Sequence, residues 1–432
     1  MSLPKYPEYK PSGVQWLGDV PAHWEVGPLK RAVALVESGV SVNAVDEPAG
    51  PGMVGVLKTS AVYSGRFEPG ENKAVVAEDL DRVACPVKAG TLIVSRMNTP
   101  SLVGAAGLVA DDAENLFLPD RLWQVHLAGA LPQFVHFWTL SPSYRAQVQM
   151  ACAGTSASMQ NLSQDEFLRF VLPLPSLEEQ TAIAHFLDHE TAKIDALIAE
   201  QEKLIHLLAE KRQATLSHAV TRGLDPAAPM KDSGVAWLGE VPAHWTVCPI
   251  KLVARIGNGS TPNRDNPDYW AEEGFPWLNS SVVNQDEVSE AERFVTELAL
   301  AECHLPVIEP PAILVGITGQ GKTRGMATRL AFKATVNQHL AYIKPTLGRI
   351  DEKFLLRIFE AVYLHLRTES EGAGSTKGAI TCEQLGNLRI PVPNLAEQIE
   401  IAAKIETETT RLDALRAEAE RAIALLKERR AA

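Results

Sequence analysis

The chain of 432 residues is 46% hydrophobic and carries 53 acidic against 41 basic residues, which gives a formal net charge of −12. This balance argues against a protein that holds nucleic acid through charge alone, because counterion release requires lysine and arginine facing phosphate. The five cysteines form no CxxC pair and no segment reaches the roughly 20 apolar residues of a membrane span, so we expect neither a zinc knuckle nor a membrane anchor and favour a reducing cytoplasm.

A stretch of nineteen residues occurs twice in the chain. SGVQWLGDVPAHWEVGPLK at 12–30 returns as SGVAWLGEVPAHWTVCPIK at 233–251, with fourteen of nineteen positions identical at an offset of 221. A second block returns at an offset of 218, with PLPSLEEQ at 173–180 and PVPNLAEQ at 391–398. The sequences between the blocks diverge strongly. The chain is therefore a duplicated unit of about 220 residues whose ends agree and whose middles differ.

The duplication predicts a division of the chain into segments. We expect, in chain order, a docking segment at 1–24, a variable domain at 25–172, a long helix at 173–220, a linker and second docking segment at 221–245, a second variable domain at 246–390 and a second long helix at 391–432. The symmetry of the repeat predicts that the first docking segment lies where the second helix ends.

Each variable domain mixes short β-rich runs with glycine, proline and asparagine turns. TLIVSR at 91–96, AILVGIT at 312–318 and LAYIKP at 340–345 are typical strands. A helix follows in each domain, near 133–150 and 350–368. These patterns predict an α+β fold with a mixed or antiparallel sheet in each variable domain.

Both long helices begin with a recognisable signal. The prolines of PLP and PVP favour extended chain, and SLEEQ and NLAEQ then form capping boxes. Apolar residues recur at alternating spacings of three and four, which is typical of a coiled-coil seam. The seam residues are Leu187, Ile194, Ile198, Ile205 and Leu208 in the first helix and Ile405, Leu412, Ile423 and Leu426 in the second. Because the halves are equivalent, we expect an antiparallel pair related by a pseudo-twofold axis.

GITGQGKT at 316–323 matches the phosphate-loop pattern GxxxxGK[ST] and follows an apolar run. A phosphate loop must open a helix whose N-terminus faces the phosphates, and the following RGMATRL is typical of turn and strand instead. A nucleotide-binding protein remains an alternative. We favour a basic glycine-rich loop that contacts DNA, since eight basic residues stand against two acidic ones between 316 and 357.

Other motifs indicate no catalytic centre. His185 and His189 are one helical turn apart, but no third ligand is apparent, which favours a solvated helix face over a metal site. The tryptophans of the repeated segment are interpreted as packing residues rather than base-stacking ones: Trp16, Trp24, Trp237 and Trp245. Neither GxSxG nor HExxH occurs, so the sequence predicts a non-enzyme without a metal.

In this order, and twice over, the motifs resemble the specificity subunit of type I restriction-modification systems. The resemblance rests on the docking sequence SGVxWLGxVPAHW, GLDPAAPMKDSG in the linker, GNGSTPNRDNPDYWAEEGFPWLNSS at 257–281, PDRLW at 119–123, NQHL at 337–340 and the blocks that begin each long helix. It implies a non-catalytic subunit whose two target-recognition domains each read one half of a bipartite, asymmetric double-stranded DNA target.

The same resemblance implies the partners. Two methyltransferase subunits would bind the helices and carry the S-adenosylmethionine chemistry, and restriction subunits, where present, would bring ATP and Mg²⁺. The chain itself would hold no cofactor. A coiled-coil scaffold that does not bind DNA is the second alternative, and it predicts no sequence-selective DNA binding even with a methyltransferase present.

Base-edge reading requires Arg or Lys for guanine and Asn or Gln for adenine on loops that face the duplex. Polar loops at 154–160 and 374–378, just before each long-helix block, add further candidates. The predicted DNA-binding residues are Lys58, Thr59, Ser60, Arg96, Asn98, Arg121, Ser156 and Gln160 in the first domain, and Asn279, Ser280, Lys322, Thr323, Arg324, Asn337, Gln338, His339, Ser375, Thr376 and Lys377 in the second.

Overall fold

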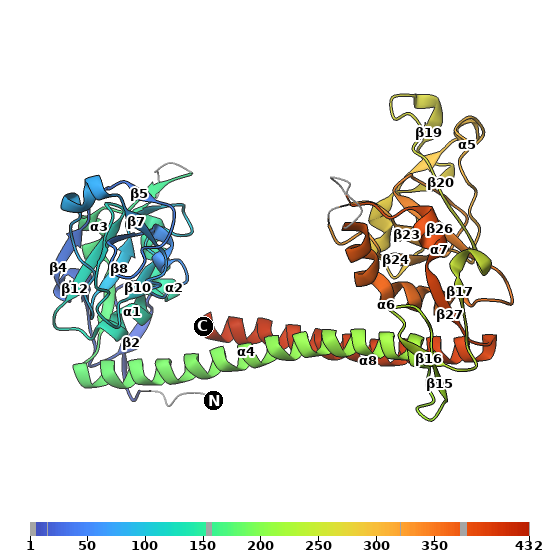
Figure 1. Ribbon diagram of the computed structural model, residues 1–432. Coiled ribbons are helices and arrows are strands. Elements are labelled where there is room, and N and C mark those ends of the chain that lie inside the picture. The colour runs from blue at the N-terminus through green and yellow to red at the C-terminus, as the bar shows by residue number, and fades with distance from the viewer. Residues whose placement is uncertain (1–5, 15, 153–157, 320, 372–377, 432) are drawn as a thin grey trace. The chain divides into compact units, whose positions relative to one another are not determined.

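The computed structural model describes residues 6–14, 16–152, 158–319, 321–371 and 378–431. It divides into two compact units (Figure 1). Unit 1 comprises Met1–Glu200 and Ile423–Ala432, and unit 2 comprises Gln201–Ala422. Each unit contains an α+β body together with part of both long helices, α4 (Leu177–Arg222) and α8 (Leu395–Ala431).

The body of unit 1 contains two four-stranded sheets. The first is antiparallel, with the order β10-β8-β12-β4, and the second, β11-β6-β7-β5, is mixed because β11 is parallel to β6. Their strands are β4 (Val33–Ser38), β8 (Leu92–Ser95), β10 (Ala106–Leu108) and β12 (Leu122–Leu127), then β5 (Ala44–Val45), β6 (Gly55–Leu57), β7 (Asn72–Val75) and β11 (Leu116–Phe117).

Strand β8 shows why this chain forms a sheet covered on both faces. Leu92 and Val94 enter the larger core with the helices, whereas Ile93 points to the opposite side and enters a second core. This alternation is the period of two that a strand imposes. Because both faces are covered, the strand is apolar over almost its whole length.

Two helices, not one, follow the first sheet. α1 (Pro132–Thr139) ends before α2 (Pro142–Ala151), so the predicted single helix at 133–150 is wrong. Pro142 has no N–H for a continuous helix and suits a first helical position, and the side chain of Ser141 accepts a hydrogen bond from the N–H of Tyr144. A short helix, α3 (Gln164–Arg169), completes this body.

The body of unit 2 repeats the plan with a larger sheet. Its five-stranded sheet has the order β18-β26-β23-β24-β21, with β21 parallel to β24, and a four-stranded sheet has the order β19-β22-β20-β25. The strands are β18 (Ala254–Asn258), β21 (Glu287–Val288), β23 (Ile313–Gly316), β24 (Ala327–Leu330) and β26 (Leu340–Pro345), then β19 (Trp270–Ala271), β20 (Phe275–Leu278), β22 (Phe294–Val295) and β25 (Thr335–Val336). The helices are α5 (Glu297–Glu302), α6 (Glu352–Glu371) and α7 (Cys382–Asn387).

Strand registers confirm the internal repeat. Ala106 lies opposite Val94 in unit 1, and Ala327 lies opposite Val315 in unit 2, so both partners are shifted by 221. The later strands β12 and β26 correspond at an offset of 218. The three-residue difference between the halves therefore falls between β10 and β12 in unit 1 and between β24 and β26 in unit 2.

The repeated blocks are the segments that pair with one another. Each docking segment forms a hairpin, β1 (Tyr9–Pro11) with β2 (Asp19–Pro21) and β15 (Met230–Asp232) with β16 (Glu240–Pro242). The next strand then pairs with the strand that enters the long helix, β3 (Glu25–Pro28) with β14 (Val171–Leu174) and β17 (Thr246–Pro249) with β27 (Arg389–Val392). The repeated sequence thus forms the paired strands that connect each body to its long helix.

A glutamate in the first turn of each long helix holds the docking segment. Glu179 accepts hydrogen bonds from His23 (2.8 Å) and from the indole of Trp24 (3.3 Å), and it also belongs to the predicted capping box with Ser176. In unit 2, Glu397 lies 2.9 Å from the indole nitrogen of Trp245. The first docking segment therefore contacts the beginning of α4.

A buried glutamine beside each of these glutamates joins the body to its helix. Gln180 accepts from the backbone N–H of Leu131 (2.8 Å), at the start of α1. Gln398 accepts in the same way from the N–H of Asp351 (2.7 Å), at the start of α6. Both side chains are almost fully buried, at 1% and 0% exposed. We call these two residues the glutamine locks.

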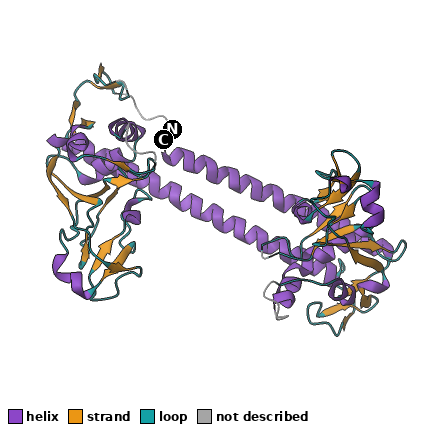
Figure 2. Ribbon diagram, turned by 90° about the horizontal axis from the view of Figure 1, so that it is seen from above, coloured by secondary structure: helices purple, strands orange, loops and turns teal. Residues whose placement is uncertain are grey.

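Two long helices are seen in Figure 2, and contacts within unit 2 show that α4 and α8 run antiparallel there. Arg212 of α4 forms an ion pair with Asp413 of α8 at 3.4 Å, and Gly223, just beyond α4, lies beside Glu397 near the start of α8. Among the predicted seam residues, four are buried and five are half-buried. The buried ones are Ile194, Leu208, Ile405 and Leu412, and the half-buried ones are Leu187, Ile198, Ile205, Ile423 and Leu426.

Within the described residues, no helix is sufficiently long and apolar to cross a membrane. The same part of the chain contains no group of three or more His, Cys, Asp or Glu side chains arranged to hold a metal ion.

Candidate nucleic-acid interface

In unit 1, predicted residues from three separate segments meet at one edge of the antiparallel sheet. Arg96 follows β8 and Arg121 precedes β12, and the N–H of Arg96 donates to the carbonyl of Arg121 at 3.0 Å. The short strand β9 (Met97–Asn98) pairs with β13 (Gln160–Asn161), which places Asn98 opposite Gln160. The sheet thus gathers four residues that are as far as 64 positions apart in sequence.

Tyr63 links this edge to Thr59. Its hydroxyl lies 2.7 Å from the hydroxyl of Thr59, and the side-chain amide of Asn98 donates to it at 2.9 Å. Tyr63 is 38% exposed, whereas Asn98 is only 7% exposed. The side chain of Asn98 therefore holds Tyr63 from below the surface. The sequence-based prediction missed Tyr63, although an aromatic residue four positions after Thr59 was the available signal.

The two arginines at this edge have different surroundings. The Arg96 guanidinium lies over the ring of Trp123, 5.7 Å from its centroid, which is a cation–π contact. Arg121 is exposed. Arg121 is therefore the more accessible of the two side chains.

Lys58 and Ser60 face carboxylates of their own unit. The hydroxyl of Ser60 donates to Glu71 at 2.5 Å, and the Lys58 ammonium lies 3.9 Å from Asp46. A hydrogen bond from Lys73, together with the charges of Lys73 and Lys58, lowers the pKa of Asp46. These two predicted residues are therefore less available to DNA than Arg121.

In unit 2 a chain of polar side chains occupies the corresponding edge. The hydroxyl of Thr261 donates to the amide oxygen of Gln338 at 2.5 Å, and the Gln338 amide nitrogen lies 3.4 Å from His339. His339 in turn lies 2.8 Å from the hydroxyl of Thr318. Gln338 is exposed, and Thr261 and His339 set the orientation of its side-chain amide. Thr261 and Thr318 were not predicted.

The backbone shows that these two edges are equivalent. The N–H of Ile317 donates to the carbonyl of His339 at 3.0 Å, as that of Arg96 does to Arg121. Gln338 and His339 therefore occupy the places of Asp120 and Arg121. The two units present the same backbone edge with different side chains.

The glycine-rich turn in unit 2 is anchored through its carbonyl groups. Tyr363 on α6 donates to the carbonyl of Lys322 at 2.8 Å, and Arg367 donates to that of Gly321 at 2.6 Å. After Thr323 the chain forms turns and then β24, not the helix that a phosphate loop opens. The geometry therefore does not support the nucleotide-binding alternative, and it leaves the Lys322 side chain exposed.

Several other predicted residues in unit 2 have structural partners. Arg324 is 3% exposed and pairs with Glu371 at 2.7 Å. Asn337 is 5% exposed and accepts from the N–H of His339. Asn279 accepts from the N–H of Ser281 and so caps a turn. Thr323 and Ser280 are half-buried. The predicted residues Ser156, Ser375, Thr376 and Lys377 lie outside the described residues.

Two α+β bodies with equivalent polar edges, each built at the start of a long helix, define a modular protein with a duplicated fold. Residues 242–422 match the family model for the type I restriction modification DNA specificity domain. The putative type I restriction enzyme MjaX specificity subunit of Methanocaldococcus jannaschii is 22% identical over 394 residues, which covers 90% of this chain and 88% of that protein. The chain is similar over most of its length to this specificity subunit of a type I restriction enzyme.

Solved structures share the fold. A chain from a study of complex assembly and conformational transition in the type I restriction-modification system aligns with a TM-score of 0.72 at 18% identity, covering 95% of this chain and 96% of that chain. The HsdS subunit from Thermoanaerobacter tengcongensis aligns with a TM-score of 0.59 at 18% identity, covering 95% of both chains.

Proposed function

We propose that this chain reads a bipartite, asymmetric double-stranded DNA target, with one half-site bound by each unit. The recognition domains would be residues 25–172 and 246–390, with docking segments at 1–24 and 221–245 and spacer helices at 173–220 and 391–432. The observation that carries the proposal is the pair of equivalent polar edges, because equal backbones with unequal side chains would read different bases. Arg121 in unit 1 corresponds to His339 in unit 2.

Base-edge chemistry assigns roles to the exposed members of the predicted set. Arg121 suits the two acceptors on the major-groove edge of guanine, and the Gln338 amide suits the donor and acceptor on adenine. Lys322 would contact phosphate and fix the position of the duplex. The more buried side chains, such as Asn98, would support these readers.

The proposed assembly includes catalytic partners. Two methyltransferase subunits would bind at the long helices and supply the S-adenosylmethionine chemistry. Restriction subunits, where present, would supply ATP-dependent and Mg²⁺-dependent activities. The complex would act on DNA in the cytoplasm.

Mapping methylated adenines tests the proposal. The chain would be produced with its methyltransferase subunits in a methylation-free host, whose DNA is then sequenced for modified adenines. We expect a single asymmetric, bipartite motif. Gln338→Ala should relax one position in one half-site, and Arg121→Ala one position in the other, each costing about 1–3 kcal/mol of discrimination.

Two results would contradict the proposal. One is methylation without sequence preference, and the other is a motif whose two half-sites change together in either variant. Lys333→Ala is the matched control, because Lys333 forms an ion pair with Glu309 at 3.1 Å and is not among the proposed readers. The control should leave the motif unchanged.

A further inference from the structure

Asp195 on α4 accepts hydrogen bonds from two arginines that lie far from it in sequence. One is Arg430, near the end of α8, whose Nε donates at 2.6 Å and whose Nη2 donates at 3.3 Å to the other oxygen. The second is Arg66, from the body of unit 1, whose Nη2 also donates to Asp195. The hydrogen bond from Arg430, with the charges of Arg430 and Arg66, lowers the pKa of Asp195. We call these three residues the Asp195 clamp.

The backbone at Arg66 is fixed to the sheet of unit 1. Gly65, just before it, has a φ of +75°, and its carbonyl accepts a hydrogen bond from His136 on α1 at 2.8 Å. On the other side lies Gly107 in β10, where a β-carbon would be 2.7 Å from the carbonyl carbon of Arg66. This close packing means that Arg66 cannot move toward or away from α4 without the sheet. The ion pair between Arg66 and Asp195 therefore connects the body of unit 1 to α4.

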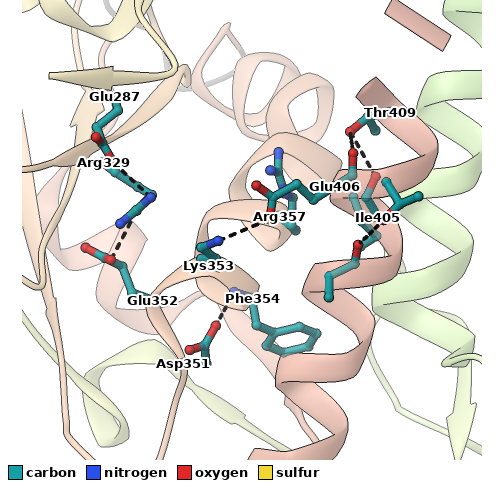
Figure 3. Close-up of polar contacts among 12 residues, drawn as sticks. Glu287, Arg329, Asp351, Glu352, Lys353, Phe354, Arg357, Ile405, Glu406 and Thr409 are labelled. Carbon is teal, nitrogen blue, oxygen red and sulfur yellow. Dashed lines mark hydrogen bonds and ion pairs between the residues drawn. The ribbon is translucent and has the colours of Figure 1, made fainter. Parts of the chain in front are cut away.

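In unit 2 a different ion pair joins the body to its long helix, between Lys353 on α6 and Glu406 on α8 at 3.1 Å (Figure 3). The counterpart of Arg66, 221 positions later, is Glu287, so the charge is reversed. Glu287 pairs with Arg329 at 2.8 Å, within the body (Figure 3). The counterpart of Asp195, 218 positions later, is Asp413, which pairs with Arg212.

A cleft in unit 2 contains the counterparts of Arg66 and Asp195. It has a volume of about 240 Å³, and both Glu287 and Asp413 line it. Glu287 and Asp413 are both acidic, so these two positions cannot form the ion pair that Arg66 and Asp195 form in unit 1, and the two units join body to helix through different residues.

We infer that Arg66 and Asp195 are positioning residues that fix the angle of the unit 1 recognition domain on α4, and that this angle selects the number of base pairs between the two half-sites. This inference rests on the proposed function. Adding one base pair moves a half-site by about 3.4 Å and turns it by about 34° around the duplex axis. A domain held at one angle on its helix would therefore favour one spacing, and a released domain would accept its neighbours.

The test uses the chain in complex with its methyltransferase subunits. Duplexes would carry the two half-sites found by methylation mapping, separated by the native spacer or by one or two base pairs more or fewer. Competition binding gives the ratio of the dissociation constants for altered and native spacers. We expect Arg66→Ala and Asp195→Asn each to lower this ratio by about fivefold, the factor of an ion pair worth about 1 kcal/mol. The double variant should lower it no further.

Matched variants separate spacing from stability. Asp413→Asn removes the ion pair between α4 and α8 in unit 2 and should leave the spacing ratio unchanged. Arg66→Lys keeps the charge and should restore most of the discrimination. Arg66 is 62% exposed at its side chain, so its removal should leave folding intact, which a melting curve checks.

The possible failures are distinguishable. A wild-type complex without preference for any bipartite target would overturn the proposed function. The wild-type complex could prefer a bipartite target while the spacing ratio of Arg66→Ala stays within about twofold of wild type. That result would leave the proposed function standing and overturn the inference about the clamp. A change in base preference at the half-site, with the spacing ratio unaltered, would also overturn it, because Arg66 would then be a reader of DNA.

Discussion

At the scale of single residues, one glutamate connects three features of each half. Glu179 caps α4, accepts from His23 and accepts from Trp24. These contacts, with the hydrogen bond from His23 as the largest cause, lower the pKa of Glu179 to about 2. The ionised carboxylate is therefore the form that holds the docking segment on the helix.

This depressed pKa predicts how docking depends on pH. Because the pKa of Glu179 is lower in the folded state than in the unfolded chain, its contribution to stability is fully present above the ordinary carboxylate range and is lost as the pH falls toward about 2. Glu179→Gln should lower the free energy of unfolding of unit 1 by about 1–2 kcal/mol at pH 7. Urea unfolding at several pH values measures this difference, which should shrink in acid. A difference that grows as the pH falls would contradict the assignment.

The glutamine locks should be more sensitive than exposed ion pairs. Gln398 accepts from the N–H of Asp351 and donates to the carbonyls of Pro393 and Arg349, all within a fully buried site. Gln398→Leu would leave these backbone groups without partners, so we expect a loss of about 2–3 kcal/mol from unit 2. Gln180→Leu should give a similar loss in unit 1. Denaturant unfolding of both variants checks the equivalence, which fails if only one of them is destabilised.

Sequence patterns named some residues of the two polar edges and missed others for a physical reason. Arg121 and Gln338 are polar residues just before strands, so local sequence revealed them. Tyr63 and Thr261 matter only because distant strands bring them to the same edge, and no local pattern records that pairing. Arg324 looked like an exposed basic residue, but Glu371 on α6 pairs with it in the interior.

At the scale of elements, the repeated blocks carried most of the predictable structure. The capping glutamates, the proline-rich strand ends and the heptads locate α4 and α8 to within a few residues. The helix at 133–150 was predicted whole because its apolar pattern continues across Ser141 and Pro142. The side-chain cap at Ser141 and the missing N–H of Pro142 end the first helix and begin the second. Both effects act over a single helical turn.

Burial along α8 predicts which seam residues stabilise the helix pair. Ile405 is fully buried in the core of unit 2, whereas Leu415 on the same helix is 42% exposed. Ile405→Ala should cost about 3 kcal/mol through lost burial and a residual cavity. Leu415→Ala, the matched control, should cost less than about 1 kcal/mol. Chemical denaturation measures both variants. If they destabilise unit 2 equally, the buried seam residues do not stabilise the helix pair more than exposed residues do.

At the scale of the whole molecule, the acidic net charge has to be reconciled with the proposed function in DNA recognition. The basic excess between 316 and 357 is largely neutralised inside unit 2. Five of its eight basic residues form ion pairs with glutamates: Arg324, Arg329, Lys333, Lys353 and Arg357. This segment therefore offers few unpaired cations to phosphate, and the partner subunits would supply much of the remaining attraction.

This charge distribution predicts weak DNA binding by the isolated chain with a shallow salt dependence. Each phosphate neutralised contributes about −0.9 to the slope of log affinity against log salt, so we expect a slope of about −2 to −3 for the chain alone and a steeper one for the complex. Lys322→Ala should reduce the slope of the isolated chain by about 0.9 because that side chain is exposed. Lys333→Ala, which removes an ion-paired lysine, should leave it unchanged. Fluorescence anisotropy between roughly 50 and 200 mM salt measures both, and a slope of about −6 for the isolated chain would show that this acidic protein binds DNA through charge after all.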